Sequence, residues 1–393
     1  MTPMHRIQRL RRDQSGMSYV FIGLSMMAFI SASMLAIDVG MLMTARSQAQ
    51  NSADSGALAG ATALLYDSFT DHSAGGPAVT SAIRAATANN VMGANVSVTP
   101  ADVVFEASPA TGQVDRVKVT VRRTAATGNP VQTLIARYFR MNTVDIGATA
   151  TAEAAPANAM TCVKPFTIPD KWIEKQTPPW DGTDTYDAYD NKGRPLANPD
   201  IYIPEYDGSG VPNPNYTGYN QESNRGQVLV LRAGNGNNIV SSFYFSLAMF
   251  DNTGGDDYRW NIANCNKHIY HWGDGLIQEP GDKEGPTIQG IEELIARDPG
   301  AHWNTATNTV EGSAFGNHSP RIFPIPLFDP IVYDSGKRNG RIADLVTANW
   351  IGFFADYVVG SQIYGRIIPI AGIYDKNGPA PNAALPKTIR LVK

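Results

Sequence analysis

Acidic side chains form one cluster in this sequence whose spacing could hold a metal ion. Four aspartates recur every third residue, at Asp181, Asp184, Asp187 and Asp190, and carboxylate oxygens are the ligands that Ca²⁺ takes in proteins. Their spacing does not match an EF-hand loop, and aspartate is common in turns because its side chain bonds the nearby backbone. We therefore treat the four as weak metal candidates and expect no metal and no cofactor.

Histidines form a second cluster. His268 and His271 lie three residues apart, with His302 and His318 further along the chain. Histidine pairs can bind a transition metal, but no Glu-x-x-His pattern accompanies this pair. The sequence also has no Gly-x-Ser-x-Gly motif and no phosphate loop with its lysine. We therefore expect a protein without enzymatic activity.

The N-terminus contains an apolar segment long enough to cross a membrane. Residues 17–37 carry no charge, and a helix of that length spans about 31 Å. Arginines precede it, including Arg11 and Arg12, and little basic charge follows. The positive-inside rule places residues 1–15 in the cytoplasm and the chain after Asp38 outside it. A cleaved secretory signal is the alternative, but the run exceeds a typical signal core of about 7–15 residues.

Three charged residues mark the predicted membrane interface, namely Arg11, Arg12 and Asp38. Asp38 stands where the helix leaves the bilayer and where water can reach its carboxylate. It either marks the interface or contacts the helix of a partner in the membrane.

Both cysteines, Cys162 and Cys265, lie on the outer side of the predicted membrane. An even pair in an oxidising compartment favours one disulfide, closing a loop of roughly 100 residues. Two separate buried thiols are the alternative, because a sequence does not show whether two Cα atoms approach each other.

Helical spacing continues beyond the apolar run, with small side chains on one face. Ala53, Gly56, Ala57, Gly60 and Ala61 share that face. Each glycine costs about 1 kcal/mol of helix propensity relative to alanine. Close approach of another backbone is the reason we infer for them.

The next segments predict a small α+β module. Residues 78–90 are alanine-rich and helical in pattern, residues 131–140 return to helical spacing, and three stretches alternate as strands do, at 95–108, 113–125 and 143–154. This order would lay a helix across a small antiparallel sheet.

The chain after residue 160 differs in composition, because all six tryptophans lie there. Turn signals separate short apolar runs, which predicts a mainly β domain with long loops. We expect strands at 227–233, 239–250, 321–328 and 362–374, and helices at 287–297 and 342–357.

The expected fold class is therefore α+β: a transmembrane helix that continues into a long extracytoplasmic helix with the small module, then a mainly β domain. The predicted divisions are a basic cytoplasmic tail, the anchor, the helix with its module, and the β domain, at 1–15, 16–38, 39–155 and 156–393. The net charge of −4 does not indicate the excess of basic residues that is typical of nucleic-acid-binding proteins.

The N-terminal region resembles that of Flp (Tad) pilus-assembly TadG-like proteins. The resemblance rests on order and spacing over about 50 residues, through Arg11, Arg12, Gly16, AIDVG at 36–40, Arg46 and QAQNSADSGALAGA at 48–61. Further stretches resemble the C-terminal part of some members of that group, which has no established activity: CVKPFTIPDKW at 162–172, YRWNIANCN at 258–266, EGPT at 284–287, DPGAHWNT at 298–305 and GRIIPI at 365–370.

Two departures from related patterns bear on processing and adhesion. Pilins and pseudopilins of these systems are usually cut after a glycine that has a glutamate five residues beyond it. Here Gly16 precedes Met17, and Phe21 takes the place of the glutamate, which argues against orthodox fibre assembly. The Asp-x-Ser-x-Ser metal motif of von Willebrand A domains, found in some TadG-like proteins, does not occur.

The resemblance implies a non-enzymatic component of Flp pilus assembly in the bacterial inner membrane, with a periplasmic structural or interaction domain. Its implied partners are the lipid bilayer and other pilus-assembly or pseudopilin-like membrane proteins, and a homo-oligomer stays open. A minor-pilin or tip-like adhesive subunit is the first alternative. A membrane-anchored envelope enzyme is the second, and it lacks any recognisable set of catalytic residues.

Overall fold

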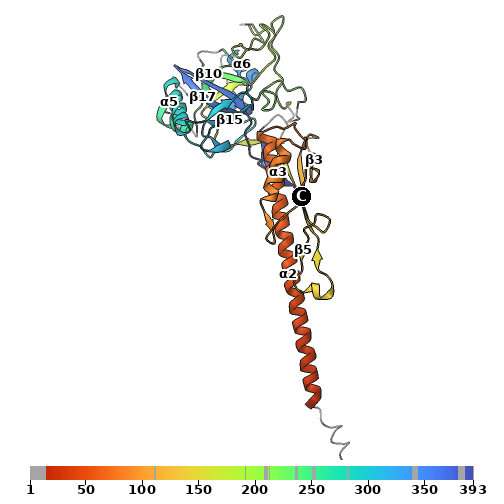
Figure 1. Cartoon of the computed structure of the whole chain (residues 1–393). Coiled ribbons are helices and arrows are strands. Elements are labelled where there is room, and N and C mark those ends of the chain that lie inside the picture. Colours follow the sequence, from red (N-terminus) through yellow and green to blue (C-terminus); the bar gives the residue numbers. More distant parts are fainter. Residues whose placement is uncertain are drawn as a thin grey trace, which may run out of the picture.

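The computed structural model describes residues 15–109, 112–190, 192–207, 211, 213–234, 238–249, 254–279, 281, 283–338, 344–378 and 386–392. One long helix forms the axis of the molecule, a small α+β module packs along its second half, and a larger folded unit sits at its far end (Figure 1). The larger unit, residues 157–378, is called the head below.

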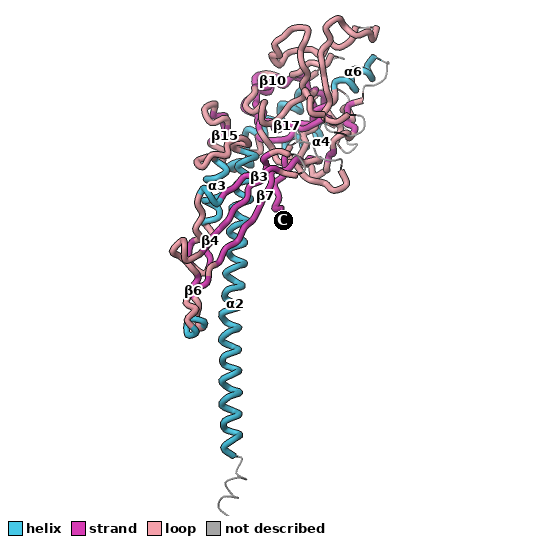
Figure 2. The backbone as a smooth tube through the Cα atoms, turned by 90° about the vertical axis from the view of Figure 1, so that its right-hand side faces the viewer, coloured by secondary structure: helices cyan, strands magenta, loops and turns pink. Residues whose placement is uncertain are grey.

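Helix α2 (Ser15–Tyr66) runs without a break for 52 residues, which corresponds to about 78 Å at 1.5 Å per residue. Residues 16–37 are exposed along their whole length, and this half of the helix stands alone below the module (Figure 2). In the second half, alanines recur every fourth residue and therefore share one face. All of them are buried: Ala45, Ala49, Ala53, Ala57 and Ala61.

The module is a two-layer arrangement in which α2 and α3 (Pro77–Thr87) cover one face of a four-stranded antiparallel sheet. We call it the stalk module. Its strand order is β19-β7-β4-β3, with β3 (Val103–Ala107), β4 (Val114–Arg123), β7 (Ile146–Pro156) and β19 (Lys387–Val392). Short elements β1 (Asn90–Val91), β2 (Ala94–Asn95) and η1 (Pro100–Asp102) connect α3 to the sheet.

A hairpin extends from the lower end of this module and lies beside α2 (Figure 1). It consists of β5 (Val131–Gln132), the short 3₁₀ helix η2 (Ala136–Phe139) and β6 (Thr143–Val144). We call residues 131–144 the foot. The predicted helix over 131–140 is wrong, because β5 pairs with β6 and only one short turn forms before Arg140 takes a left-handed conformation at φ 65°.

The head is built on a closed barrel of strands. The order β17-β16-β9-β11-β10-β18 closes because β18 also pairs with β17, and β13 adds to one end of β17. Apolar side chains such as Phe166, Ile325 and Phe353 fill its core. The bounds are β9 (Phe166–Pro169), β10 (Val228–Ala233), β11 (Phe243–Ser246), β13 (Gly275–Leu276), β16 (Ile322–Phe328), β17 (Leu345–Val359) and β18 (Gln362–Ile368).

The longest strand of the barrel was predicted as a helix. The prediction of a helix over 342–357 is wrong for its described part, because residues 345–359 form β17. Nine consecutive residues of β17, 347–355, are buried, so the alternation that identifies a half-buried strand is absent. The β-branched and aromatic side chains of this stretch, including Trp350 and Phe353, favour the strand.

Helices and smaller strands cover the barrel. Helix α5 (Glu284–Arg297) confirms the helix predicted over 287–297, and it packs closely on α4 (Gly255–Ala263), which the sequence did not predict. The remaining elements are β8 (Ala159–Met160), β12 (Tyr270–His271), β14 (His302–Asn304), β15 (Thr309–Glu311), η3 (Gly316–His318) and α6 (Pro330–Arg338). The mixed helix and strand content confirms the predicted α+β fold class.

The chain ends back in the stalk module. After the head, β19 pairs antiparallel with β7 along six residue pairs, from Lys387 with Pro156 to Val392 with Thr151. This strand lies beyond residue 156, so the sheet of the module is completed by a segment that the predicted divisions assign to the β domain. The predicted domain limits themselves stay a prediction.

Candidate functional site

The free half of α2 is a candidate membrane anchor. Its most apolar 18-residue stretch has a mean hydropathy of 2.2, and the rest of the described chain buries none of that stretch. Large apolar side chains such as Phe21 and Phe29 are 66% and 75% exposed. Such a surface is unfavourable in water and matches the length of a bilayer core. Among the described residues, one helix is long and apolar enough to cross a membrane, and that helix is α2.

The processing candidates lie at the start of this helix. Gly16 and Met17 belong to the first turn of α2, and a Cβ placed at Gly16 would meet nothing within 4 Å in the described part of the chain apart from its own helix backbone. Arg11 and Arg12 lie outside the described residues. Whether the chain is cut after Gly16 therefore stays a prediction.

Asp38, at the end of the apolar segment, fastens α2 to the foot. Its Oδ1 accepts a hydrogen bond from the Leu134 N–H at 2.9 Å, and its Oδ2 accepts one from the Ala136 N–H at 2.5 Å. The N–H of Ile135 lies within hydrogen-bonding distance of both oxygens, at 3.2 and 3.0 Å. The side chain is only 3% exposed. A carboxylate that accepts several backbone N–H groups is strongly held, so the foot is fixed at the level where the anchor ends.

The predicted small-residue face is occupied by the chain itself. All five of its residues are buried where α2 meets α3 and the sheet: Ala53, Gly56, Ala57, Gly60 and Ala61. A Cβ at Gly56 would lie 2.9 Å from the Ala86 Cβ, and one at Gly60 would lie 2.7 Å from the Val117 Cγ1. The glycines therefore allow close packing within one chain, and a partner would have to meet another side of α2.

The far end of α2 is joined to the head by Arg225. Its guanidinium donates to the backbone carbonyls of Tyr66 and Asp67, at 2.5 and 2.8 Å. These groups lie at the helix C-terminus, where carbonyls lack helical partners and attract a cation. The head thus supplies the cap for the helix that carries it.

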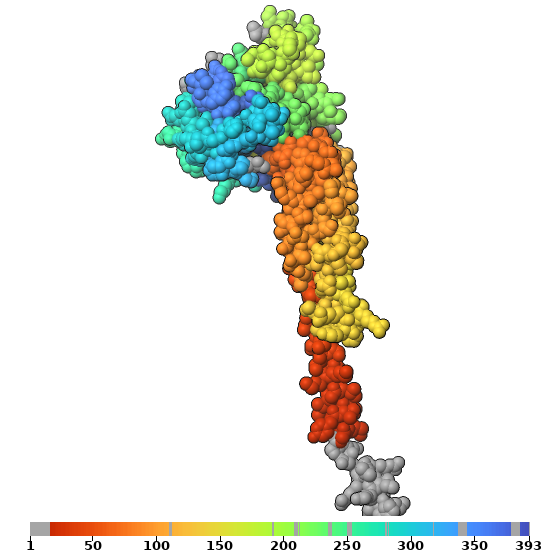
Figure 3. Space-filling model, in the orientation of Figure 1, coloured from red at the N-terminus to blue at the C-terminus, as the bar shows by residue number. Residues whose placement is uncertain are grey.

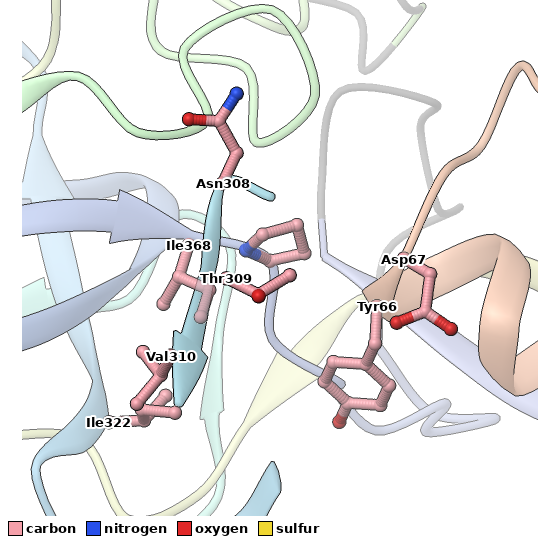
Figure 4. A pocket seen from close by; sticks show the side chains of 8 residues that line it. Tyr66, Asp67, Asn308, Thr309, Val310, Ile322 and Ile368 are labelled. Atoms are coloured by element: carbon pink, nitrogen blue, oxygen red, sulfur yellow. The ribbon is translucent and has the colours of Figure 1, made fainter. Parts of the chain in front are cut away.

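A small hollow remains beside this junction. Tyr66 and Asp67 line one side of it, and Asn308, Thr309 and Val310 of the β15 region line the other (Figure 4). Its volume is about 40 Å³, which is enough for roughly one water molecule. It is therefore too small for a metabolite.

The returning strand β19 is fixed by a buried carboxylate. Glu153 on β7 is 1% exposed, and it pairs with Arg116 of β4 at 2.8 Å and with Arg390 of β19 at 2.7 Å. Removing one charged partner from such a buried network leaves another charge uncompensated. This destabilises the fold by more than the intact network stabilises it. Glu153 therefore ties together three neighbouring strands.

The two cysteines confirm the predicted disulfide. Cys162 and Cys265 are bonded, with their Cα atoms 4.3 Å apart and a sequence separation of 103 positions. The bond holds the segment after β8 against the end of α4. Beside it, the Lys164 ammonium donates to the carbonyl of Asn264 at 3.0 Å. Burial and the nearby Arg297 lower the pKa of Lys164 to about 7.

Three of the four aspartates that recur every third residue accept hydrogen bonds from nearby backbone N–H groups. Asp181 accepts from the Thr183 N–H, Asp184 from the Asp181 N–H, and Asp190 from the Arg194 N–H, at 2.9 Å in each case. Asp187 donates its N–H to Asp200 at 2.7 Å. Within the described ranges, no three His, Cys, Asp or Glu side chains gather closely enough to hold a metal ion.

The histidine cluster does not assemble into one site. The His271 Nε2 lies 2.9 Å from a carboxylate oxygen of Asp375, while His268 contacts the Tyr270 ring at 4.6 Å between centroids. His302 belongs to β14 and His318 to η3. The contact of His271 joins β12 to a loop of the head.

Asp170 is a fully buried carboxylate of the head with several hydrogen-bond donors around it. Asp170 accepts from the hydroxyls of Tyr202 and Tyr216 at 2.9 and 2.6 Å, and from the N–H groups of Lys171 and Tyr219 at 2.8 and 2.9 Å. Burial raises the pKa of Asp170 to about 6, although these donors oppose the rise. The group lies wholly inside the protein, so its role is to organise the loops around it.

Sequence patterns did not reveal that Asp38 fastens α2 to the foot. They also did not identify Arg225 as the helix cap or Glu153 as the residue that links three strands. The sequence left Asp38 either as an interface marker or as a contact for a partner's helix, because the residues that it binds lie almost 100 positions away in sequence. The alternating KTIRLV at 387–392 is a signal that could have predicted β19. No local pattern marks Arg225.

The geometry defines a class of protein: one candidate membrane helix that carries an α+β stalk module and a disulfide-bonded barrel head. Residues 16–63 match the family model described as "Putative Flp pilus-assembly TadE/G-like". This match confirms the predicted resemblance for the N-terminal region and supports involvement in Flp pilus assembly. No curated protein and no solved structure matches the chain.

Proposed function

We propose that this chain is a non-enzymatic, membrane-anchored component of Flp pilus assembly. Residues 16–38 hold it in the bacterial inner membrane, residues 1–15 face the cytoplasm, and the stalk module and head form a periplasmic interaction domain. The observation that carries the proposal is the continuity of α2, which leaves an exposed apolar segment and enters the core of the stalk module without a break.

Several features support this role. The family match covers the same helix, at residues 16–63, and the disulfide suits an oxidising compartment. The rigid junctions at Asp38 and Arg225 would hold the head at a set height above the membrane. A spacer of this kind serves an assembly component better than a diffusing enzyme.

The proposed partners are other pilus-assembly or pseudopilin-like membrane proteins. They would meet the lipid-facing side of the anchor or the outer surface of the head, because the small-residue face is filled by α3 and the sheet. A homo-oligomer through the anchor is compatible with the same surfaces.

Complementation of a strain that lacks this protein tests the proposal. The full chain should restore surface pili, whereas residues 39–393 exported behind a cleavable secretory signal should not, because the head would no longer be held at the membrane. The secreted fragment needs a check for folding by its disulfide and protease resistance. Full restoration of pili by a folded, soluble fragment would contradict the anchored role.

A minor-pilin or tip-like subunit is the second candidate. It is favoured by Gly16 and Met17 in the first turn of an exposed continuous helix, which is where a prepilin peptidase would cut. Shearing fibres from cells and probing them for the head separates the two roles. A minor pilin would appear in the fibres with a chain that starts at Met17, and an assembly component would stay in the membrane fraction.

A further inference from the structure

The foot exposes an unusual set of side chains at the lower end of the stalk module. Four of its apolar residues have large exposed fractions: Leu134 50%, Tyr138 74%, Phe139 74% and Met141 58%. Large apolar groups gathered on a short surface hairpin mark a contact with something other than water. Nothing within the described chain covers them.

Basic charge accompanies these apolar groups. Arg137 and Arg140 are both exposed on the same hairpin, and the Arg137 guanidinium lies 5.3 Å from the centre of the Tyr138 ring. No acidic residue lies within residues 131–144. Tyrosine and arginine beside apolar side chains are the residues that settle at the boundary between lipid headgroups and acyl chains.

The foot is also placed and held at the right level. Its backbone is fastened to α2 at Asp38, which is the first charged residue after the uncharged run 17–37. Its base is closed by the β5–β6 pairing and by a hydrogen bond from the Thr133 N–H to the Asn142 carbonyl at 3.1 Å. In the space-filling view it forms the lowest part of the folded region, directly above the bare helix (Figure 3).

We propose that the foot is a second membrane contact, which inserts Tyr138, Phe139 and Met141 into the interfacial layer of the bilayer and pairs its two arginines with lipid phosphates. This rests on the proposed anchoring by residues 16–38 and goes beyond it. A single helix can tilt and rotate in a bilayer. A second contact fixed to the same helix would set the tilt of the stalk and therefore the position of the head.

The charge pattern of the foot favours phospholipid as the molecule that it contacts. A basic and aromatic surface next to the span fits anionic headgroups, and each arginine near such a surface is worth about a fivefold change in occupancy. A protein partner is the other class of occupant, and the experiment below distinguishes the two.

The test is site-directed spin labelling of the full chain in nanodiscs that hold one copy and contain anionic phospholipid. Both native cysteines are in the disulfide, so an introduced cysteine takes the label. Three matched substitutions are made at exposed phenylalanines: Phe29→Cys in the anchor, Phe139→Cys in the foot and Phe315→Cys in the head. Their side chains are 75%, 74% and 51% exposed, so none is a core change.

Collision of each label with oxygen, which concentrates in lipid, and with a water-soluble nickel complex gives the depth. We expect the ratio of oxygen to nickel collisions at position 139 to lie between the high value at position 29 and the low value at position 315. Arg137→Gln together with Arg140→Gln should lower the ratio at position 139 and leave the other two positions unchanged.

Each other outcome overturns a defined statement. If position 29 reports lipid but position 139 matches position 315, the foot is not a membrane contact, although the anchor stands, and its apolar surface would belong to a protein partner. If position 29 also reports water, the anchoring itself is wrong. If position 139 is shielded from both reagents, another part of the same chain covers the foot, because each nanodisc holds one copy, and the lipid contact is excluded.

Discussion

Asp38 and Arg225 hold the two ends of the folded half of α2. The first accepts three backbone N–H groups from the foot, and the second donates to carbonyls at the helix C-terminus. Neither contact depends on a neighbouring residue in the sequence. Local patterns could predict the helix between them, but the partners of these two side chains depend on how distant segments fold together.

The buried carboxylate Asp170 should make stability depend on pH. Its pKa is about 6 in the folded protein against 3.8 for an ordinary aspartate, so the folded state binds the proton more strongly. Its contribution is therefore fully present below about pH 4 and is lost as the pH rises to about 6. The shift corresponds to about 3 kcal/mol.

Asp170→Asn should remove this part of the pH dependence, because the amide keeps the shape and does not ionise. Urea unfolding of the full chain at several pH values between 4 and 7 measures it. Asp200, whose pKa burial also raises to about 6, contributes in the same direction, so the comparison with Asp170→Asn isolates the first group. An unchanged slope in the variant would show that Asp170 does not hold a proton in this range.

Loss of the Arg225 cap should loosen the junction between stalk and head. Arg225→Gln removes the guanidinium hydrogen bonds to the carbonyls of Leu65, Tyr66 and Asp67, at a cost of about 1–3 kcal/mol. Hydrogen exchange should become faster in the segment that follows Tyr66. The matched control is Arg194→Gln, which breaks an exposed ion pair with Asp190 and should change little. Equal protection of that segment in both variants would mean that Arg225 is not a cap.

At the level of elements, helix α2 was well predicted because its signals are local and long. An apolar run, followed by alanines and glycines at helical spacing, left one interpretation. Strand β4 was predicted for the same reason, since its side chains alternate between buried and half-buried positions. Strand β17 was missed because burial on both faces removes that alternation, and the foot was missed because hydrogen bonds to Asp38 replace the expected helix.

The close packing of α2 predicts opposite effects for two glycines on the same helix. Gly60→Ala places a methyl group 2.7 Å from the Val117 Cγ1, so overpacking should destabilise the stalk module by about 1–3 kcal/mol. Gly40→Ala is the control, because a Cβ at position 40 would meet nothing within 4 Å in the described chain apart from its own helix backbone, and helix propensity alone should give up to about 1 kcal/mol of stability.

Chemical unfolding of both variants in detergent measures this difference. Membrane insertion should be unaffected by either substitution, because neither residue lies in the uncharged run 17–37. A Gly60→Ala protein as stable as Gly40→Ala would mean that α2 and the sheet are not in close contact.

At the scale of the whole molecule, the chain closes on itself through β19. The disulfide stabilises the head, and β19 returns to the sheet of the stalk module beside β7. The sequence predicted a change of architecture near residue 155 but not this return, because pairing between segments more than 200 residues apart leaves no local trace. The head and the stalk module are therefore linked at both ends of the head.

Removal of β19 should weaken the stalk module rather than the head. A chain that ends at residue 386 loses six residue pairs with β7 and leaves Glu153 without Arg390. β7 would become an exposed sheet edge, which favours aggregation. We expect proteolysis to attack residues 90–156 in this variant, while the disulfide-bonded head remains resistant. Resistance of both parts would contradict a structural role for β19.

The most direct test of the proposed permanent anchor is the intact mass of the protein, with its N-terminal sequence, after purification from membranes and from sheared fibres. The account predicts a chain that begins at residue 1 or 2 and is recovered from the membranes. A chain that begins at Met17 and is recovered from the fibres would contradict it, because Gly16 would then be a prepilin cleavage site and α2 would be the stem of a pilus subunit.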